Sequence, residues 1–198
     1  FKNLNFYLPS ISVKYTKGLV VPYSDGPTNA KNPAEHLYMK IISYAKKYVY
    51  IATPYLVLDS NFVNLLTLCA KGGVDVRIVV PGIPDKKIVY RLTRSYYAQL
   101  IPSGVKIYEY TPGFIHGKTI VSDDSVGIVG SINLDSRSLT WNYECATYMY
   151  KNDSVDDLKK DFLDTFDKCK LVKMEDTVKH KFFSKFLDYI LRILAPLI

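Results

Sequence analysis

Residues 114–144 read FIHGKTIVSDDSVGIVGSINLDSRSLTWNYE. The β-branched and aliphatic residues of HGKTIVSD predict a strand, and SVGIVGS predicts a second strand after a turn at residues 123–125. Because successive side chains of a strand alternate between its faces, His116 and Lys118 are expected to point to the same side. Gly117 leaves the opposite face bare, where another backbone can approach. The sequence therefore predicts a hairpin that carries an imidazole beside an ammonium.

The same stretch holds further polar side chains that suit phosphoryl transfer. A neutral histidine such as His116 can attack phosphorus, and Lys118 and Asn133 can hold the non-bridging oxygens in the transition state. The carboxylate of Asp123 or Glu144 could fix the tautomer of a histidine. A lone H-x-K would indicate only a surface histidine. The complete set within one short window favours a phosphoryl-transfer site.

An anion-binding corner is expected at the end of the second predicted strand. There the backbone N–H at Gly130 and Ser131, the Ser131 hydroxyl and the Asn133 amide could converge on a phosphate. We therefore expect Gly130 and Ser131 to bind substrate.

The composition agrees with an anionic partner. The chain has 198 residues, a formal net charge of +7, 17 tyrosines and nine phenylalanines. Such a charge favours nucleic acid, phospholipid head groups or a phosphorylated small molecule. Cys69, Cys145 and Cys169 show no metal-binding spacing, so we expect three buried thiols and weakly favour a reducing compartment. No carboxylate or thiol cluster is apparent, and we expect neither a metal ion nor another cofactor.

The remaining chain alternates predicted strands and helices, which is typical of an α/β fold. We expect a linker with one leading strand over residues 1–32, a catalytic half-domain over 33–173, and a basic amphipathic helix within 174–198. That last helix either lies in a membrane interface or docks on the sheet. His36 is expected on a helix surface, and His180 on the polar face of the last helix. Predicted helices cover residues 34–48, 59–71, 85–100 and 154–169, and predicted strands cover 18–23, 49–55, 74–80, 105–110 and 142–150.

The spacing H-x-K-x4-D at residues 116–123 resembles the HKD signature of the phospholipase D superfamily. GSINLDSRSLTWNYE is similar to the second-motif region of bacterial cardiolipin synthases, and the stretches YIATPYLVLDSNF and GVKIYEYTPGFIHGK agree. The resemblance extends from about Gly18 to Ile198. It implies a mixed-sheet α/β/α sandwich of phospholipase D type with one HKD half-domain. It also implies that the chain is the C-terminal half of a longer enzyme with two such motifs.

The activity implied by this resemblance is phosphatidyl transfer. Two phosphatidylglycerol molecules give cardiolipin and glycerol through a phosphohistidine intermediate. His116 supplies the nucleophile or the general acid and base; in the family the histidine of the N-terminal motif is usually the nucleophile. Lys118 and Asn133 hold phosphate oxygens with help from Ser131. Asp123 is read as structural support within the motif, and Glu144 resembles the residue that orients the partner motif's histidine.

Two other functions remain open from the sequence. One is a homodimeric phospholipase D-like nuclease or phosphodiesterase, and the other is a non-catalytic module that binds acidic lipid or nucleic acid by charge. The L-D-x-R-S and T-P-Y stretches resemble the lipid branch, so nucleic acid is an unlikely partner and Tyr55 is expected to bind substrate. The expected partners are phosphatidylglycerol, the membrane surface, and either the N-terminal HKD half of the same enzyme or a second copy of this chain.

The expected location is the cytosol-facing side of a bacterial cell membrane for the full-length enzyme. The chain itself shows no signal peptide and no apolar run of about 18 residues. As a fragment, it is expected to be soluble or peripheral.

Overall fold

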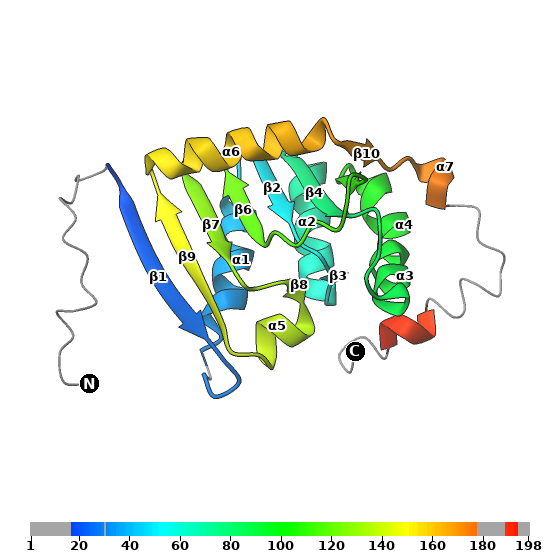
Figure 1. Cartoon of the computed structure of the whole chain (residues 1–198), viewed down its shortest axis with the longest axis horizontal. Coiled ribbons are helices and arrows are strands. Elements are labelled where there is room, and N and C mark those ends of the chain that lie inside the picture. The colour runs from blue at the N-terminus through cyan, green and yellow to red at the C-terminus, as the bar shows by residue number, and fades with distance from the viewer. Residues whose placement is uncertain (1–16, 30, 178–188, 194–198) are drawn as a thin grey trace.

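The computed structural model describes residues 17–29, 31–177 and 189–193. An eight-stranded mixed sheet forms the centre of the molecule (Figure 1). The pairs β2–β4 and β4–β5 are parallel, and the other neighbours are antiparallel. From edge to edge the strands are β1 (Leu19–Asp25), β9 (Glu144–Tyr150), β7 (Val126–Gly130), β6 (Thr119–Ser122), β2 (Tyr48–Ala52), β4 (Asp75–Pro81), β5 (Lys106–Tyr110) and β10 (Cys169–Leu171).

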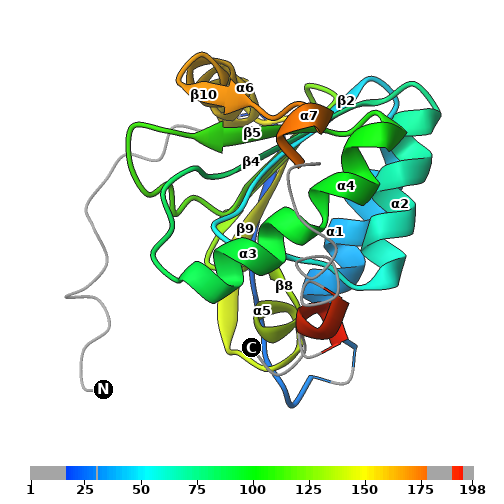
Figure 2. The ribbon, with the colours of Figure 1, turned by 90° about the vertical axis from the view of Figure 1, so that its right-hand side faces the viewer.

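Helices cover both faces of the sheet (Figures 1 and 2). Residues of the helices α1 to α5 pack in the core on one face, and residues of α6 pack in the core on the other. The predicted α/β/α sandwich is therefore confirmed. The bounds are α1 (Pro33–Tyr44), α2 (Ser60–Lys71), α3 (Lys87–Ser95), α4 (Tyr97–Leu100), η2 (Ile101–Ser103), α5 (Ser136–Thr140), α6 (Asp153–Phe166) and α7 (Met174–Thr177).

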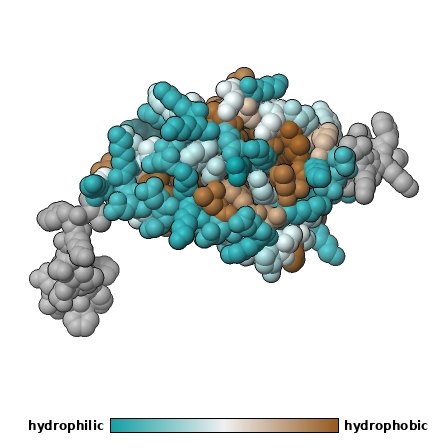
Figure 3. Space-filling model, turned by 90° about the horizontal axis from the view of Figure 1, so that it is seen from above, coloured by the Kyte–Doolittle hydropathy of each residue, from teal (hydrophilic) through white to brown (hydrophobic). Residues whose placement is uncertain are grey.

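Alternation along the central strand β2 produces the two cores. Val49 and Ile51 belong to the larger core with the residues of α1 and α2, while Tyr50 packs with Phe162 and Phe166 of α6 on the other face. A strand buried on both faces reads as a continuous apolar run. The side of the molecule that lies uppermost in Figure 1, over α6, is mainly hydrophilic with separate apolar patches (Figure 3).

A second, two-stranded sheet joins the two segments that end near the site. β3 (Leu56–Val57) pairs in parallel with β8 (Leu134–Asp135). The buried Thr53 hydroxyl fastens this pair, because it accepts from the Leu134 N–H at 3.0 Å and donates to the Tyr55 carbonyl at 2.8 Å. This small sheet brings the residues that follow β2 beside those that follow β7.

Several sequence expectations need correction. The strand predicted from His116 begins only at Thr119, and the residues before it form an extended loop. The helix predicted over 85–100 is split into α3 and α4, and α3 begins only at Lys87. The helix predicted to reach Cys169 ends at Phe166, and Cys169 begins β10. The short elements β3, β8, α5 and η2 were not predicted.

The predicted leading strand is part of the central sheet rather than of a separate linker. β1 pairs with β9 over all seven residues from Leu19 to Asp25, so a boundary at residue 32 divides a single sheet. The Cys145 side chain on β9 faces solvent, because side chains alternate along a strand and the neighbouring Ala146 faces the core. The expectation of three buried thiols is therefore wrong for Cys145, and Cys69 and Cys169 are only half-buried.

Most of the predicted C-terminal amphipathic helix, including His180, lies outside the described residues. Residues 189–193 are helical. Leu191 packs against the larger core, and the Arg192 guanidinium lies 4.3 Å from the centre of the Tyr96 ring and donates to the Ser95 hydroxyl at 3.0 Å. This short segment therefore docks on the protein through Leu191 and Arg192. Among the described helices, none is both long enough and apolar enough to cross a membrane.

Candidate active site

The His116–Lys118 pair lies in the extended loop that enters β6. The Lys118 ammonium Nζ is 3.0 Å from His116 Nδ1 and 3.1 Å from Nε2, and it donates to the His116 carbonyl at 2.8 Å. Lys118 is only 9% exposed, whereas the imidazole is open to solvent. The two side chains meet as expected, although an extended loop rather than a strand places them. A cation is thus fixed directly beside an accessible imidazole.

The charges around this pair favour a neutral imidazole. Burial and then the neighbouring Lys118 ammonium lower the pKa of His116, and Asp85 acts in the opposite direction. Burial also lowers the pKa of Lys118, while Glu144 and Asp135 counteract it. Because the ordinary pKa of histidine is about 6.5, a lowered value leaves the ring neutral at pH 7. A neutral ring can act as a nucleophile or as a general base.

Ser131 holds Glu144 rather than an open anion site. Its hydroxyl donates to Glu144 Oε2, and its backbone N–H donates to the Cys145 carbonyl at 2.8 Å. The Asn142 side chain holds the other carboxylate oxygen of Glu144 at 3.2 Å. The expected convergence of the Ser131 N–H and hydroxyl on a phosphate is therefore wrong in this structure, because both donors are already used. Glu144 is held on both sides at the start of β9.

Gly130 is required by close packing. A Cβ at this position would lie 2.4 Å from the Ala146 Cβ and 2.5 Å from the Cys145 carbonyl oxygen. The Gly130 N–H donates to the Lys118 carbonyl at 3.2 Å, so it too is not free for substrate. The absence of a side chain at Gly130 therefore allows β9 to approach β7 closely. The same close approach does not occur at Gly117, where a Cβ would meet nothing within 4 Å.

Asn133 and Asp135 form the polar corner next to this pair. The Asn133 amide Nδ2 donates to the buried Ser138 hydroxyl at 2.9 Å, while its Oδ1 is buried without a hydrogen-bond partner among the described residues. The Asp135 carboxylate caps α5 by accepting from the Ser138 N–H at 2.7 Å. Burial raises the pKa of Asp135, although Ser138 and Asn133 oppose this shift. Asp135 was not among the predicted site residues, although it belongs to the L-D-x-R-S stretch and stands just before a short helix.

Tyr55 lies on the other side of the same corner. Its hydroxyl donates to Asp85, and burial and then that contact raise the pKa of Tyr55 to about 12. The tyrosine therefore stays protonated at neutral pH and can present only a neutral hydroxyl and ring to a ligand. The position of Tyr55 beside Asn133 follows from the β3–β8 pairing.

Asp123 lies away from the catalytic pair. It follows the far end of β6 and accepts hydrogen bonds from the backbone N–H groups of Lys46, Lys47 and Tyr48 at 2.7–2.9 Å. Its φ of 52° is a left-handed conformation that aspartate tolerates better than most residues. The possibility that Asp123 fixes the tautomer of His116 is wrong, and the structure supports the alternative of a structural carboxylate.

Two further expectations concern histidines and metal ligands. His36 is exposed on α1, as predicted. Within the described parts of the chain, no group of three or more His, Cys, Asp or Glu side chains is arranged to hold a metal ion.

The sequence model of the family described as "Cardiolipin synthase, PLD-like domain" matches residues 38–166. The chain belongs to this phospholipase D-like family. The resemblance inferred from the sequence is therefore confirmed.

Relatives of this phospholipase D-like domain occur in longer bacterial proteins. An uncharacterized protein from Streptococcus mutans is 45% identical over 181 residues, which are 91% of this chain and 39% of the relative. A cardiolipin synthase from Geobacillus kaustophilus is 35% identical over 194 residues, which are 98% of this chain and 39% of the relative. The chain thus spans about two fifths of the length of these curated relatives.

Solved structures confirm the fold of the phospholipase D-like domain. Phosphatidylserine synthase from Haemophilus influenzae aligns with a TM-score of 0.72 at 14% identity, covering 90% of this chain and 47% of that one. Nuc from Salmonella typhimurium, a phospholipase D family member, aligns with a TM-score of 0.66 at 18% identity, covering 79% of this chain and 99% of that one.

Proposed function

We propose that this chain is one catalytic half of a phosphatidyltransferase that converts two phosphatidylglycerol molecules into cardiolipin and glycerol. The observation that carries the proposal is the contact of the buried Lys118 ammonium with the accessible His116 ring. Support also comes from relatives named cardiolipin synthase at about one third identity. The enzyme class rests on the family, whereas the substrates are our inference.

The proposed reaction has two displacement steps at one phosphorus atom. In the first, a motif histidine attacks the phosphorus of phosphatidylglycerol; a P–N bond forms, the P–O bond to glycerol breaks, and the other motif histidine protonates the departing glycerol oxygen. In the second, a hydroxyl of another phosphatidylglycerol attacks the phosphohistidine; a P–O bond forms, the P–N bond breaks, and the same histidine takes the hydroxyl proton. The residues return to their starting protonation states.

His116 serves as one of the two histidines in this scheme. The family pattern favours the general acid and base role for it, and the lowered pKa suits the step in which it removes the proton of the acceptor hydroxyl. Lys118 neutralises charge on the phosphoryl oxygens, and the Asn133 amide adds a neutral contact. In this proposal Glu144, which Ser131 and Asn142 hold, orients a histidine contributed by the second motif.

The second motif comes from another half-domain in this proposal. The curated relatives are more than twice the length of this chain, which leaves room for an N-terminal half of similar size. Because both substrates are lipids, the reaction takes place at the surface of a bacterial membrane. Phosphatidylglycerol and that surface are therefore the proposed partners.

The test is cardiolipin formation by the full-length protein that contains this chain, supplied with phosphatidylglycerol vesicles. His116→Ala and Lys118→Ala are expected to lower the rate by about 10²–10⁴-fold without loss of folding, since each removes a group that acts on the reacting phosphate. His36→Ala is the matched control and retains the rate. Activity that disappears with His36→Ala and survives His116→Ala would overturn the assignment. Cleavage of nucleic acid in place of lipid transfer would replace the proposed substrate.

A further inference from the structure

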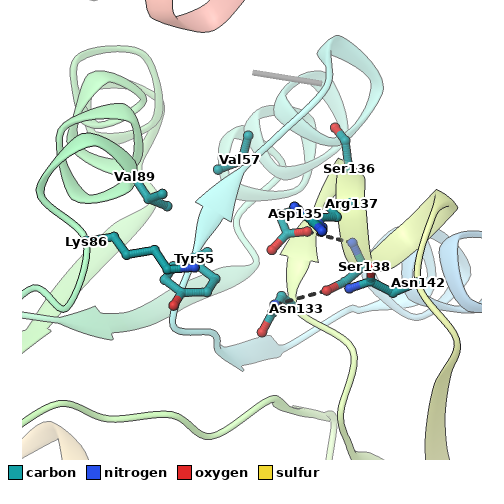
Figure 4. A pocket seen from close by; sticks show the side chains of 10 residues that line it. All are labelled: Tyr55, Val57, Lys86, Val89, Asn133, Asp135, Ser136, Arg137, Ser138 and Asn142. Carbon is teal, nitrogen blue, oxygen red and sulfur yellow. Dashed lines mark hydrogen bonds between the residues drawn. The ribbon is translucent and has the colours of Figure 1, made fainter. Parts of the chain in front are cut away.

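A cavity of about 260 Å³ lies between the β3–β8 pair and the helices α3 and α5 (Figure 4). Apolar side chains of β3 and α3 form part of its wall. The other side chains that matter here are polar or charged: Tyr55, Lys86, Asn133, Asp135 and Arg137.

The cavity lies at the same end of the sheet as the catalytic pair. Ala52 pairs with Thr119, and the Gly130 N–H donates to the Lys118 carbonyl. Tyr55 and Asn133, which follow Ala52 and Gly130 by three positions, both line the cavity.

The Asp135 carboxylate of the cavity acts electrostatically on Lys118. On the other side, the Tyr55 hydroxyl is bonded to Asp85, whose charge acts on His116. A molecule in the cavity would therefore lie at the same end of the sheet as a phosphorus held at the His–Lys pair.

Two cations stand at the rim of the cavity. Lys86 comes from the start of α3 and Arg137 from α5, on opposite sides (Figure 4). In the described part of the chain neither forms an ion pair, and the Lys86 ammonium lies 5.6 Å from the centre of the Tyr55 ring. Two cations without acidic partners at the mouth of a small cavity favour an anionic ligand.

The floor of the cavity offers acceptors for hydroxyl groups. Asp135 is only 7% exposed, and an ionised carboxylate has about four acceptor positions. The Ser138 N–H occupies one, and the Ser138 hydroxyl and the Asn133 amide also hydrogen-bond to this carboxylate, which leaves room for one more donor. Asn133 Oδ1 is a second buried acceptor without a partner among the described residues. Because unsatisfied buried acceptors are costly, a ligand hydroxyl at this place would be stabilised. The complementary ligand is a small anion that also carries hydroxyl groups.

We propose that this cavity is the acceptor subsite, and that it binds the phosphoglycerol head group of the second phosphatidylglycerol. The inference rests on the proposed function. Lys86 and Arg137 flank the acceptor's phosphate, and Asp135 accepts a hydrogen bond from one glycerol hydroxyl. The remaining hydroxyl attacks the phosphorus of the phosphohistidine; a P–O bond forms, the P–N bond breaks, and the hydroxyl proton passes to His116. At about 260 Å³ the cavity is smaller than a typical site for a drug-sized ligand, about 300–1,000 Å³, so the acyl chains stay outside.

The experiment compares two products of the full-length protein on phosphatidylglycerol vesicles. Transfer to the acceptor gives cardiolipin, and transfer to water gives phosphatidic acid. Lys86→Gln and Arg137→Gln are each expected to lower the ratio of cardiolipin to phosphatidic acid about tenfold, because each removes a charge-assisted contact to the acceptor. Lys87→Gln removes the same charge from the next position of α3, does not line the cavity, and keeps the wild-type ratio.

A competition arm identifies the chemistry that the cavity recognises. Added glycerol phosphate is expected to suppress cardiolipin formation more than hydrolysis in the wild type, and to lose this selectivity in both variants. Inorganic phosphate, which suits the phosphoryl site, suppresses both products equally. An unchanged product ratio in the two variants, or an equal loss of both products, overturns the acceptor subsite while the proposed function stands. A wild-type protein that makes neither product overturns the proposed function and this inference with it.

Discussion

At the scale of single residues, the Lys118 ammonium controls the protonation of the imidazole beside it. Burial and this ammonium both lower the pKa of His116, so removing the charge must raise that pKa. We expect Lys118→Gln to shift the NMR titration of the His116 ring to higher pH. In the wild type the neutral form predominates down to a lower pH than in this variant.

The control for this titration is Lys87→Gln, which removes a charge from an exposed position of α3. It should leave the titration of His116 in place. A pKa of His116 that stays the same or falls in Lys118→Gln would show that the contact does not control the ring.

Asp123 carries a second prediction at this scale, on stability. Its carboxylate binds three backbone N–H groups at the start of β2. Asp123→Asn cannot accept in the same way on both oxygens, and the expected loss is about 1–3 kcal/mol in the free energy of unfolding. Denaturant unfolding measures it, with the exposed Asp164→Asn on α6 as the control for the change in charge. The pKa of the His116 ring is expected to stay unchanged in Asp123→Asn. A shifted pKa would show that Asp123 acts on the catalytic histidine.

At the scale of secondary-structure elements, the approach of β9 to β7 depends on a missing side chain. A Cβ at Gly130 would be forced against Ala146 and the Cys145 carbonyl, so Gly130→Ala should separate the strands or strain them. Overpacking of this kind costs about 1–3 kcal/mol or more. Gly117→Ala is the matched control, because its Cβ would meet nothing within 4 Å. Equal melting temperatures for the two variants would contradict this account.

The elements that the sequence predicted well are those set by local rules. α2 begins where Asp59 accepts from the Phe62 N–H and ends at Lys71, close to the predicted range of 59–71. β3 and β8 have only two residues each, and tertiary pairing alone makes them strands. No local period reveals such elements.

The candidate site also has one part that local sequence rules predict and another that depends on tertiary contacts. The His116–Lys118 contact was predictable because two residues separated by one position in an extended chain share a side. The hydrogen bond from the Ser131 hydroxyl to Glu144 could not be predicted, because Glu144 lies 13 positions further along the chain, on β9. The acceptor cavity unites Tyr55, Lys86 and Asn133 from three separate connections, so it becomes visible only once the sheet is assembled.

At the scale of the whole molecule, the chain presents a single His–Lys pair among the residues described. Exposed aromatic side chains lie just before Glu144 in the sequence, with Trp141 65% and Tyr143 76% exposed. Large exposed apolar side chains near a site often mark an interface. In the proposed two-motif enzyme, the N-terminal half would cover them.

The chain by itself is therefore expected to transfer phosphatidyl groups far more slowly than the full-length enzyme. The proposed mechanism needs a histidine on each side of the phosphorus, and only a second copy of this chain can supply one to an isolated half. Activity per chain should then rise with concentration as dimers form, and Trp141→Ala should weaken that rise. Leu68→Ala, which truncates an equally exposed apolar residue on α2, is the control. Phosphatidyl transfer measured across a dilution series, with light scattering on the same samples, decides the matter. Full activity in a monomeric sample would show that one motif suffices, and the interpretation of this chain as half of a catalytic site would be wrong.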